Sequence, residues 1–260
     1  MEIIGKISKG TKMDQIYISK QRTPGFEIGE SVLIKPIRLN KEGIKLFYNN
    51  IKSIEPVKII IIKEIFKYLS YADNVIITGS FLEKGFNFKD IDVILVDNKN
   101  ASLDKIKNDL IRILGLEIHI IHVNYKDLFR GLIMDPLFNL MLSKFISMKR
   151  VIFKRKKQIN YKLLDLYLLE SKLLIDNYDL LSGNNKYKSI RNLFAISLFL
   201  DDKELSLTFV NSEIDEYFGE GSVVRIKENM LDKDIFSKKY QLFYNKVFKK
   251  IIKGIENEQK

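Results

Sequence analysis

The stretch "VIITGSFLEKGFNFKDIDVILVDN", which runs from Val75 to Asn98, shapes the interpretation of the whole chain. A short apolar run leads into Gly79-Ser80, and a second apolar run follows directly after Asp90-Ile91-Asp92. Apolar runs of this length, bounded by turn residues, predict two short buried strands. The pattern therefore places two acids, one residue apart, at the start of a strand whose other residues suit the interior.

The two acids predict a metal site. Side chains two residues apart on a strand point to the same face, so Asp90 and Asp92 project together. Two carboxylates side by side repel each other, and burying them without a cation is costly. Oxygen ligands select a hard divalent ion such as Mg²⁺, which keeps several waters and shares the phosphates of a substrate.

A third acid, Glu117, is expected beside this pair. It lies in the apolar stretch "LEIHIIHV", which reads as a strand and follows a helix predicted between Ser102 and Gly115. A connection of this length places two strands in one sheet. His119 shares a face with Glu117, and it is either a proton acceptor at the edge of the site or a partly buried histidine bonded to the backbone.

Gly79-Ser80 predicts a phosphate-binding turn. Glycine permits a tight turn and a close approach of the backbone to a ligand. Ser80 offers a hydroxyl and an N–H at the start of the next helix or turn, where phosphate oxygens bind well. Together with the acids, this turn predicts transfer of a nucleotidyl group by a two-metal mechanism.

The stretch "GSFLEKGFNFKDIDVIL" resembles the signature of the DNA polymerase β-type nucleotidyltransferase superfamily, and the minimal type most closely. The resemblance covers about residues 57–123. It implies that Gly79 and Ser80 bind the triphosphate of an NTP, expected to be ATP. It also implies that Asp90, Asp92 and Glu117 are the catalytic acids and hold two Mg²⁺ ions. Many relatives have Asp in place of Glu117, and an Arg after Gly-Ser where this chain has, loosely, Lys84.

The predicted fold class is α+β, with a small mixed β-sheet nucleotidyltransferase core at residues 57–135. A small β module and connector are expected at 1–56, and a helical substrate-binding domain at 136–260. In the first segment, "KGTKMDQIYISK" and "IGESVLIKPI" resemble the hairpin of swapped-hairpin DNA-binding domains, although any small β barrel would look similar. In the last segment, one helix is expected from Pro136 to Lys149 and another from 160 to 183.

Charge is distributed unevenly along the chain, whose net charge is +11. Residues 1–56 hold ten Lys and Arg against six Asp and Glu, residues 57–135 hold eleven of each, and residues 136–260 hold 23 against 16. Basic flanks favour polyanions such as nucleic acid or NTP, and ordinary Lys-rich helix surfaces would give the same surplus. The basic run "MKRVIFKRKKQINYK" is open to the same two interpretations.

The chain has no cysteine, no apolar stretch long enough for a membrane span and no evident export signal. A cytoplasmic protein without membrane contact is expected. The expected reaction moves an NMP from an NTP to a hydroxyl acceptor and releases pyrophosphate. The acceptor is an RNA 3′ end, a protein hydroxyl or a small molecule such as an aminoglycoside. Two alternatives remain: a non-catalytic module that binds nucleic acid or a partner, and a member of a toxin–antitoxin-type gene pair.

Overall fold

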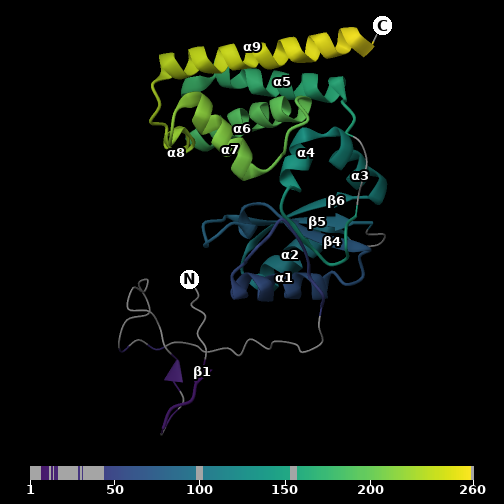
Figure 1. The fold of residues 1–260 in the computed structure, drawn as a ribbon. Coiled ribbons are helices and arrows are strands. Elements are labelled where there is room, and N and C mark those ends of the chain that lie inside the picture. Colours follow the sequence, from purple (N-terminus) through teal and green to yellow (C-terminus); the bar gives the residue numbers. More distant parts are fainter. Residues whose placement is uncertain are drawn as a thin grey trace.

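The computed structural model describes residues 7–11, 13, 15–16, 29, 31, 44–97, 102–152 and 157–258. A five-stranded sheet lies at the centre, with two helices on one side and a layered group of helices on the other (Figure 1). The fold is α+β with a mixed sheet, as the sequence predicts.

The sheet has the strand order β3-β7-β4-β5-β6. Its strands are β3 (Phe47–Asn49), β7 (Phe145–Ser147), β4 (Asn74–Thr78), β5 (Asp90–Val96) and β6 (Glu117–Val123). All neighbouring strands are antiparallel except β5 and β6, which are parallel and joined by one crossover helix. The sheet therefore takes strands from both sides of the segment 57–135.

Both faces of the central strands are covered, which explains why their sequences are apolar runs rather than alternating patterns. Helices α1 (Pro56–Tyr68) and α2 (Leu103–Leu114) pack on the face that includes Val75, Ile77 and Val93. Helix α3 (Tyr125–Met134) packs on the opposite face, against Ile76 and Ile94. The second face is also the one to which Asp92 belongs, because side chains alternate along β5.

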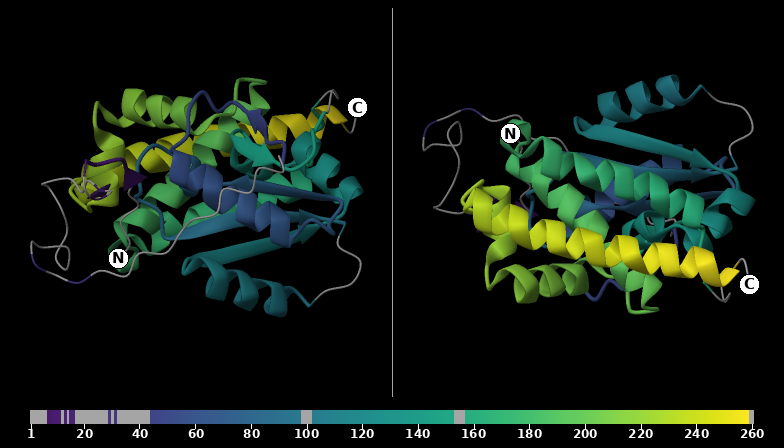
Figure 2. Two further views of the ribbon diagram at one scale, coloured as in Figure 1. Left: turned by 90° about the horizontal axis from the view of Figure 1, so that it is seen from below. Right: turned by 90° about the horizontal axis from the view of Figure 1, so that it is seen from above.

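The helical layer lies beyond α3 and α4 (Pro136–Met141). Its helices are α5 (Tyr161–Asp176), α6 (Gly183–Leu200), α7 (Leu207–Phe218), α8 (Ser222–Lys227) and α9 (Lys233–Glu258). Most of α6 is buried because α4, α5, α7, α8 and α9 all contact it. Helices α5 and α9 lie side by side on the outside of the molecule (Figures 1 and 2).

The structure confirms the expected helix after residue 57, the strands around Gly79 and Asp90, and the helix that ends at Gly115. At the N-terminus, the two-residue strands β1 (Ile7–Ser8) and β2 (Gln15–Ile16) pair antiparallel. The stretch "ESVLIKPI", expected as a further strand, lies almost wholly outside the described residues.

Two predicted helices begin where expected but end too early. The helix expected from Pro136 ends at Met141, and the next apolar residues form β7, in which pairing with β4 buries Ile146. Short apolar runs suit a buried helix or a buried strand equally well, so periodicity could not separate them. The helix expected to close near Gly183 ends at Asp176.

Gly183 begins α6 instead of ending α5. Ser182 is its N-cap and accepts a hydrogen bond from the backbone N–H of Asn185 at 3.3 Å. A Cβ on Gly183 would overlap the carbonyl oxygen of Lys227, so the glycine allows α8 to pack closely against the start of α6. Helix α3 was not anticipated from the sequence.

Candidate functional site

Gly79 is held in a conformation that only glycine adopts readily, with φ 82° and ψ −164°. A Cβ at this position would overlap the Oδ2 atom of Asp92. The turn that follows β4 therefore packs directly against the second acid of the Asp-x-Asp pair. Ser80 is exposed and begins the short 3₁₀ turn η1 (Ser80–Leu82).

The acids of β5 and β6 lie in register. Asp90 pairs with Glu117, and Asp92 pairs with His119. Paired residues on neighbouring parallel strands project to the same face, so these four side chains share one end of one face of the sheet. The strand pairing expected from the sequence is thus confirmed.

His119 is 60% exposed, and its Nδ1 atom lies 3.1 Å from Oδ1 of Asp92. The interpretation of His119 as a partly buried histidine bonded to the backbone is wrong. Its ring extends over the second acid because the β5–β6 register places the two residues side by side.

The acids do not gather into one cluster. Within the residues that the structure describes, no group of three or more His, Asp or Glu side chains is placed to hold a metal ion. Asp90 and Asp92 are half-buried, whereas Glu117 is exposed. The pair alone fits Mg²⁺, which proteins often bind through one or two carboxylates together with substrate phosphates and waters. Glu117 as a third ligand stays a prediction.

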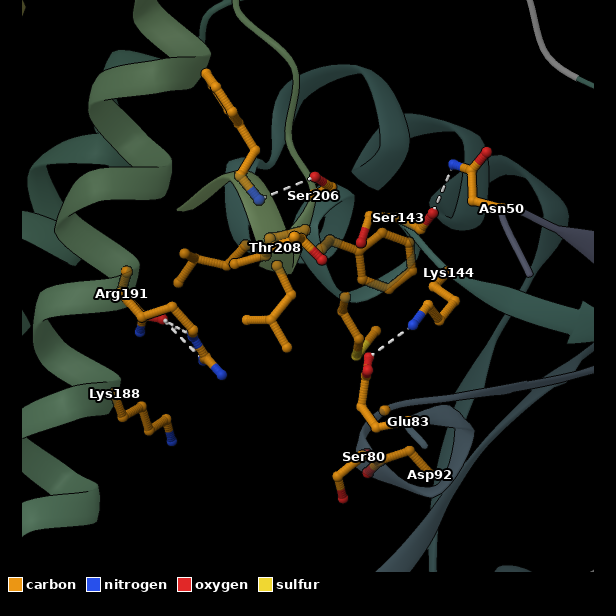
Figure 3. Close-up of a pocket in the computed structure, with 18 of the residues that line it drawn as sticks. Asn50, Ser80, Glu83, Asp92, Ser143, Lys144, Lys188, Arg191, Ser206 and Thr208 are labelled. Atoms are coloured by element: carbon orange, nitrogen blue, oxygen red, sulfur yellow. Dashed lines mark hydrogen bonds and ion pairs between the residues drawn. The ribbon is translucent and has the colours of Figure 1, made fainter. Parts of the chain in front are cut away.

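A cavity of about 1450 Å³ opens between the sheet and the helical layer (Figure 3). Gly79, Ser80 and Asp92 line its sheet side, and Lys188 and Arg191 point into it from α6 on the opposite side. Asp90 and Glu117 are not part of its lining. Of the five site residues predicted from the sequence, three line the cavity and two lie outside its lining.

Two acids that line the cavity, Glu83 and Asp135, accept hydrogen bonds from other side chains of the protein. Glu83 accepts one from Nζ of Lys144 at 3.0 Å. Asp135 is the N-cap of α4 and also accepts a hydrogen bond from the Tyr167 hydroxyl at 2.9 Å. Burial and the Asp135 carboxylate raise the pKa of Tyr167. These acids have structural partners and contribute little free negative charge to the cavity.

The cations of the α6 side have no acidic partner among the described residues. Arg191 donates two hydrogen bonds, at 3.3 and 2.9 Å, to the Oδ1 atom of Asn192, and no described carboxylate forms an ion pair with it. Burial lowers the pKa of Arg191. Lys188 is exposed and has no hydrogen bond or ion pair with any described residue. Sequence reasoning assigned no role to either cation, although their i, i+3 spacing puts them on one face of a helix.

The spacer between Gly-Ser and Asp-x-Asp is fastened to α1 by a buried lysine. The Lys58 ammonium is fully buried, lies 3.1 Å from the Glu55 carboxylate and donates to the carbonyl oxygen of Glu83 at 2.5 Å. The Gly85 N–H donates to Glu55 at 2.6 Å. Three aromatic rings surround the ammonium at 5.4–5.8 Å, those of Phe81, Phe86 and Phe88. The spacer is therefore held through the backbone of Glu83 and Gly85 and through its aromatic rings.

Comparisons with protein-family models, with curated proteins and with solved structures find no match to this chain. Among the described residues, no helix is both long enough and apolar enough to cross a membrane. The basic run after Met148 lies partly outside the described residues.

Proposed function

We propose that this protein transfers a nucleoside monophosphate from an NTP, expected to be ATP, to a hydroxyl acceptor. One observation carries the proposal: the turn at Gly79 packs against Asp92 so closely that no side chain fits between them, at the edge of a large cavity. This packing supports a backbone that approaches a phosphate next to an acid pair. We place the activity in the cytoplasm, in keeping with a chain without cysteine.

The proposed reaction is an in-line displacement at the α-phosphorus of the NTP. The acceptor oxygen bonds to that phosphorus, the bond to the bridging oxygen breaks, and pyrophosphate leaves with the electron pair. Ser80 and the backbone beside it would bind the triphosphate, and Glu117 would help to remove the proton of the acceptor hydroxyl. Asp90 and Asp92 would hold Mg²⁺, which when bound would neutralise the charge that builds up on the phosphates.

A second candidate function is binding of NTP or nucleic acid without transfer. The dispersed acids favour it, because the described residues do not bring three possible ligands around one metal position. An enzyme of the proposed kind needs the phosphate charge neutralised during transfer, whereas a binding module does not. A partner protein from a toxin–antitoxin-type gene pair is compatible with either function.

The test is transfer of label from each α-³²P-labelled NTP, with Mg²⁺ and with total RNA or protein extract as acceptor. Asp90→Asn and Asp92→Asn remove the charges with little change in shape, and Asp104→Asn, exposed on α2, is the matched control. We expect transfer by the parent and the control, and none by the two site variants. If the parent transfers nothing and binds NTP as well as both site variants do, the second function replaces the first.

A further inference from the structure

The cavity is larger than one ligand requires. Pockets for a single small molecule or cofactor enclose about 300–1,000 Å³, and this cavity encloses about 1450 Å³. The sheet side carries Gly79, Ser80 and Asp92, which the proposed function assigns to the NTP. The α6 side is therefore available for a second molecule, and in the proposed reaction that molecule is the acceptor.

The α6 side is built for an anion. Arg191 is half-buried beside the largely apolar buried residues of α6, and among the described residues its guanidinium donates hydrogen bonds only to the amide oxygen of Asn192. Moving an unpaired charge away from water is costly, so proteins keep such groups paired or bind an anion to them. Arginine is also the side chain whose planar donors best fit a phosphate.

Two further cations lie near Arg191 in the cavity lining. Lys188 stands one helical turn before it, and Figure 3 shows both side chains pointing from α6 into the open space. Lys227 also lines the cavity, with its Nζ atom 4.2 Å from the centre of the Tyr187 ring. None of the three forms an ion pair with a carboxylate that the structure describes. The same lining carries one exposed acid just after α6, Glu204, so a polycationic acceptor such as an aminoglycoside would meet more cations than acids on this side.

We propose that Arg191 and Lys188 bind backbone phosphates of a single-stranded RNA, whose 3′ hydroxyl is the acceptor. This inference rests on the proposed function for the reaction, but RNA binding itself is measurable without transfer. The positive surplus of residues 136–260 supports the choice, because a basic chain attracts a long polyanion from solution. If the same cations bind the triphosphate of the NTP instead, their substitution weakens binding of ATP and not of RNA.

The test uses the full chain, a fluorescein-labelled single-stranded oligoribonucleotide and fluorescence anisotropy over a series of salt concentrations. Arg191→Met and Lys188→Met remove one charge each and keep the apolar stems. Lys246→Met, exposed on α9 and outside the cavity lining, is the control for the same change of net charge. Binding of Mg²⁺·ATP is measured in parallel by calorimetry.

We expect each α6 variant to bind the RNA about tenfold more weakly. The slope of log K against log salt should fall by about 0.7, as one phosphate contact is lost. The control should change RNA affinity by less than about twofold, and ATP affinity should not change in any variant. The Tm of Arg191→Met should also shift upward, because an unpaired charge leaves a half-buried position.

Two results would overturn the inference. If the α6 variants weaken ATP binding and leave RNA binding intact, the phosphate belongs to the NTP. If all three variants weaken RNA binding equally, only long-range charge is involved. RNA binding that depends on Arg191 in a protein without transfer activity would reject the proposed function and keep this inference, so the two fail separately.

Discussion

Asp92 of the acid pair on β5 and the cation pair on α6 line the same cavity, yet only the acids form a motif that is visible in the sequence. The acids stand one residue apart, next to a turn, and their chemistry can be seen in consecutive letters of the sequence. The cations lie about a hundred residues later in helix α6, and only the fold brings them to the cavity that Asp92 also lines (Figure 3). A local motif identifies one side of a site from the sequence, whereas the residues of the opposite side are identified only from the tertiary structure.

The largest effect is expected at the motif, where the turn at Gly79 packs against Asp92. Gly79→Ala should lower transfer at least about a hundredfold, since the added methyl group displaces the Asp92 carboxylate. It should also lower the free energy of unfolding by about 3 kcal/mol through strain at positive φ and the overlap. Radiolabel transfer and urea denaturation measure the two effects.

Gly115→Ala is the matched control for Gly79→Ala. Gly115 also has a positive φ, 67°, but a Cβ there meets no atom within 4 Å. Its substitution should cost about 1 kcal/mol of stability and leave transfer unchanged. If both alanine variants lose the same stability and both keep transfer, close packing of the turn on Asp92 has no functional value.

The second prediction concerns the spacer between Gly-Ser and Asp-x-Asp. The buried side chain that contacts it, Lys58, lies outside the motif. Lys58→Met keeps the volume of the buried side chain and removes its hydrogen bond to Glu83 and its ion pair with Glu55. We expect a fall in Tm of about 5 °C and reduced transfer, because the residues after Ser80 lose their anchor. Lys67→Met, exposed on the same helix, should change neither. Equal Tm values for the two variants would show that the lysine does not hold the spacer.

The pH dependence of stability tests the contacts of Glu55 with Lys58 and Gly85. The Gly85 N–H, the N–H of Glu55 itself and Lys58 lower the pKa of Glu55 from 4.5 to about 2. Since the folded pKa is the lower one, the contribution of Glu55 is complete above pH 4.5 and is lost as pH falls toward 2. The Tm difference between the parent and Glu55→Gln should therefore shrink across that range. A constant difference, or one equal to that of exposed Glu216→Gln, would contradict this assignment.

Part of the fold and of the candidate site was predictable from the sequence. The strands around Gly79 and Asp90 and the partner strand of Glu117 were predictable, because their signals are local: apolar runs, turn residues and a capped helix. The strand β7 and the start of α6 at Gly183 were not, because each depends on a neighbour that is distant in the sequence. His119 shows the same limit, since its position beside Asp92 follows from strand register.

The smallest expected effect concerns β7, the strand that the sequence did not reveal. The Ser147 hydroxyl is fully buried and has no hydrogen-bond partner among the described residues. On the neighbouring strand β4, the buried Thr78 hydroxyl lies within hydrogen-bond distance of the carbonyl oxygens of Met141 and Lys144, at 2.5 and 2.9 Å. A buried hydroxyl without a partner costs free energy, whereas one with partners contributes it.

Ser147→Ala should therefore raise the free energy of unfolding by about 1 kcal/mol, and Thr78→Val should lower it by about the same amount. Urea denaturation of both variants measures the two values. A loss of stability in Ser147→Ala would mean that its hydroxyl has a partner in solution and that β7 is held by more than its backbone pairing and apolar contacts. Opposite signs would show that this end of the sheet gains stability from the hydroxyl beside Gly79 and none from the one on β7.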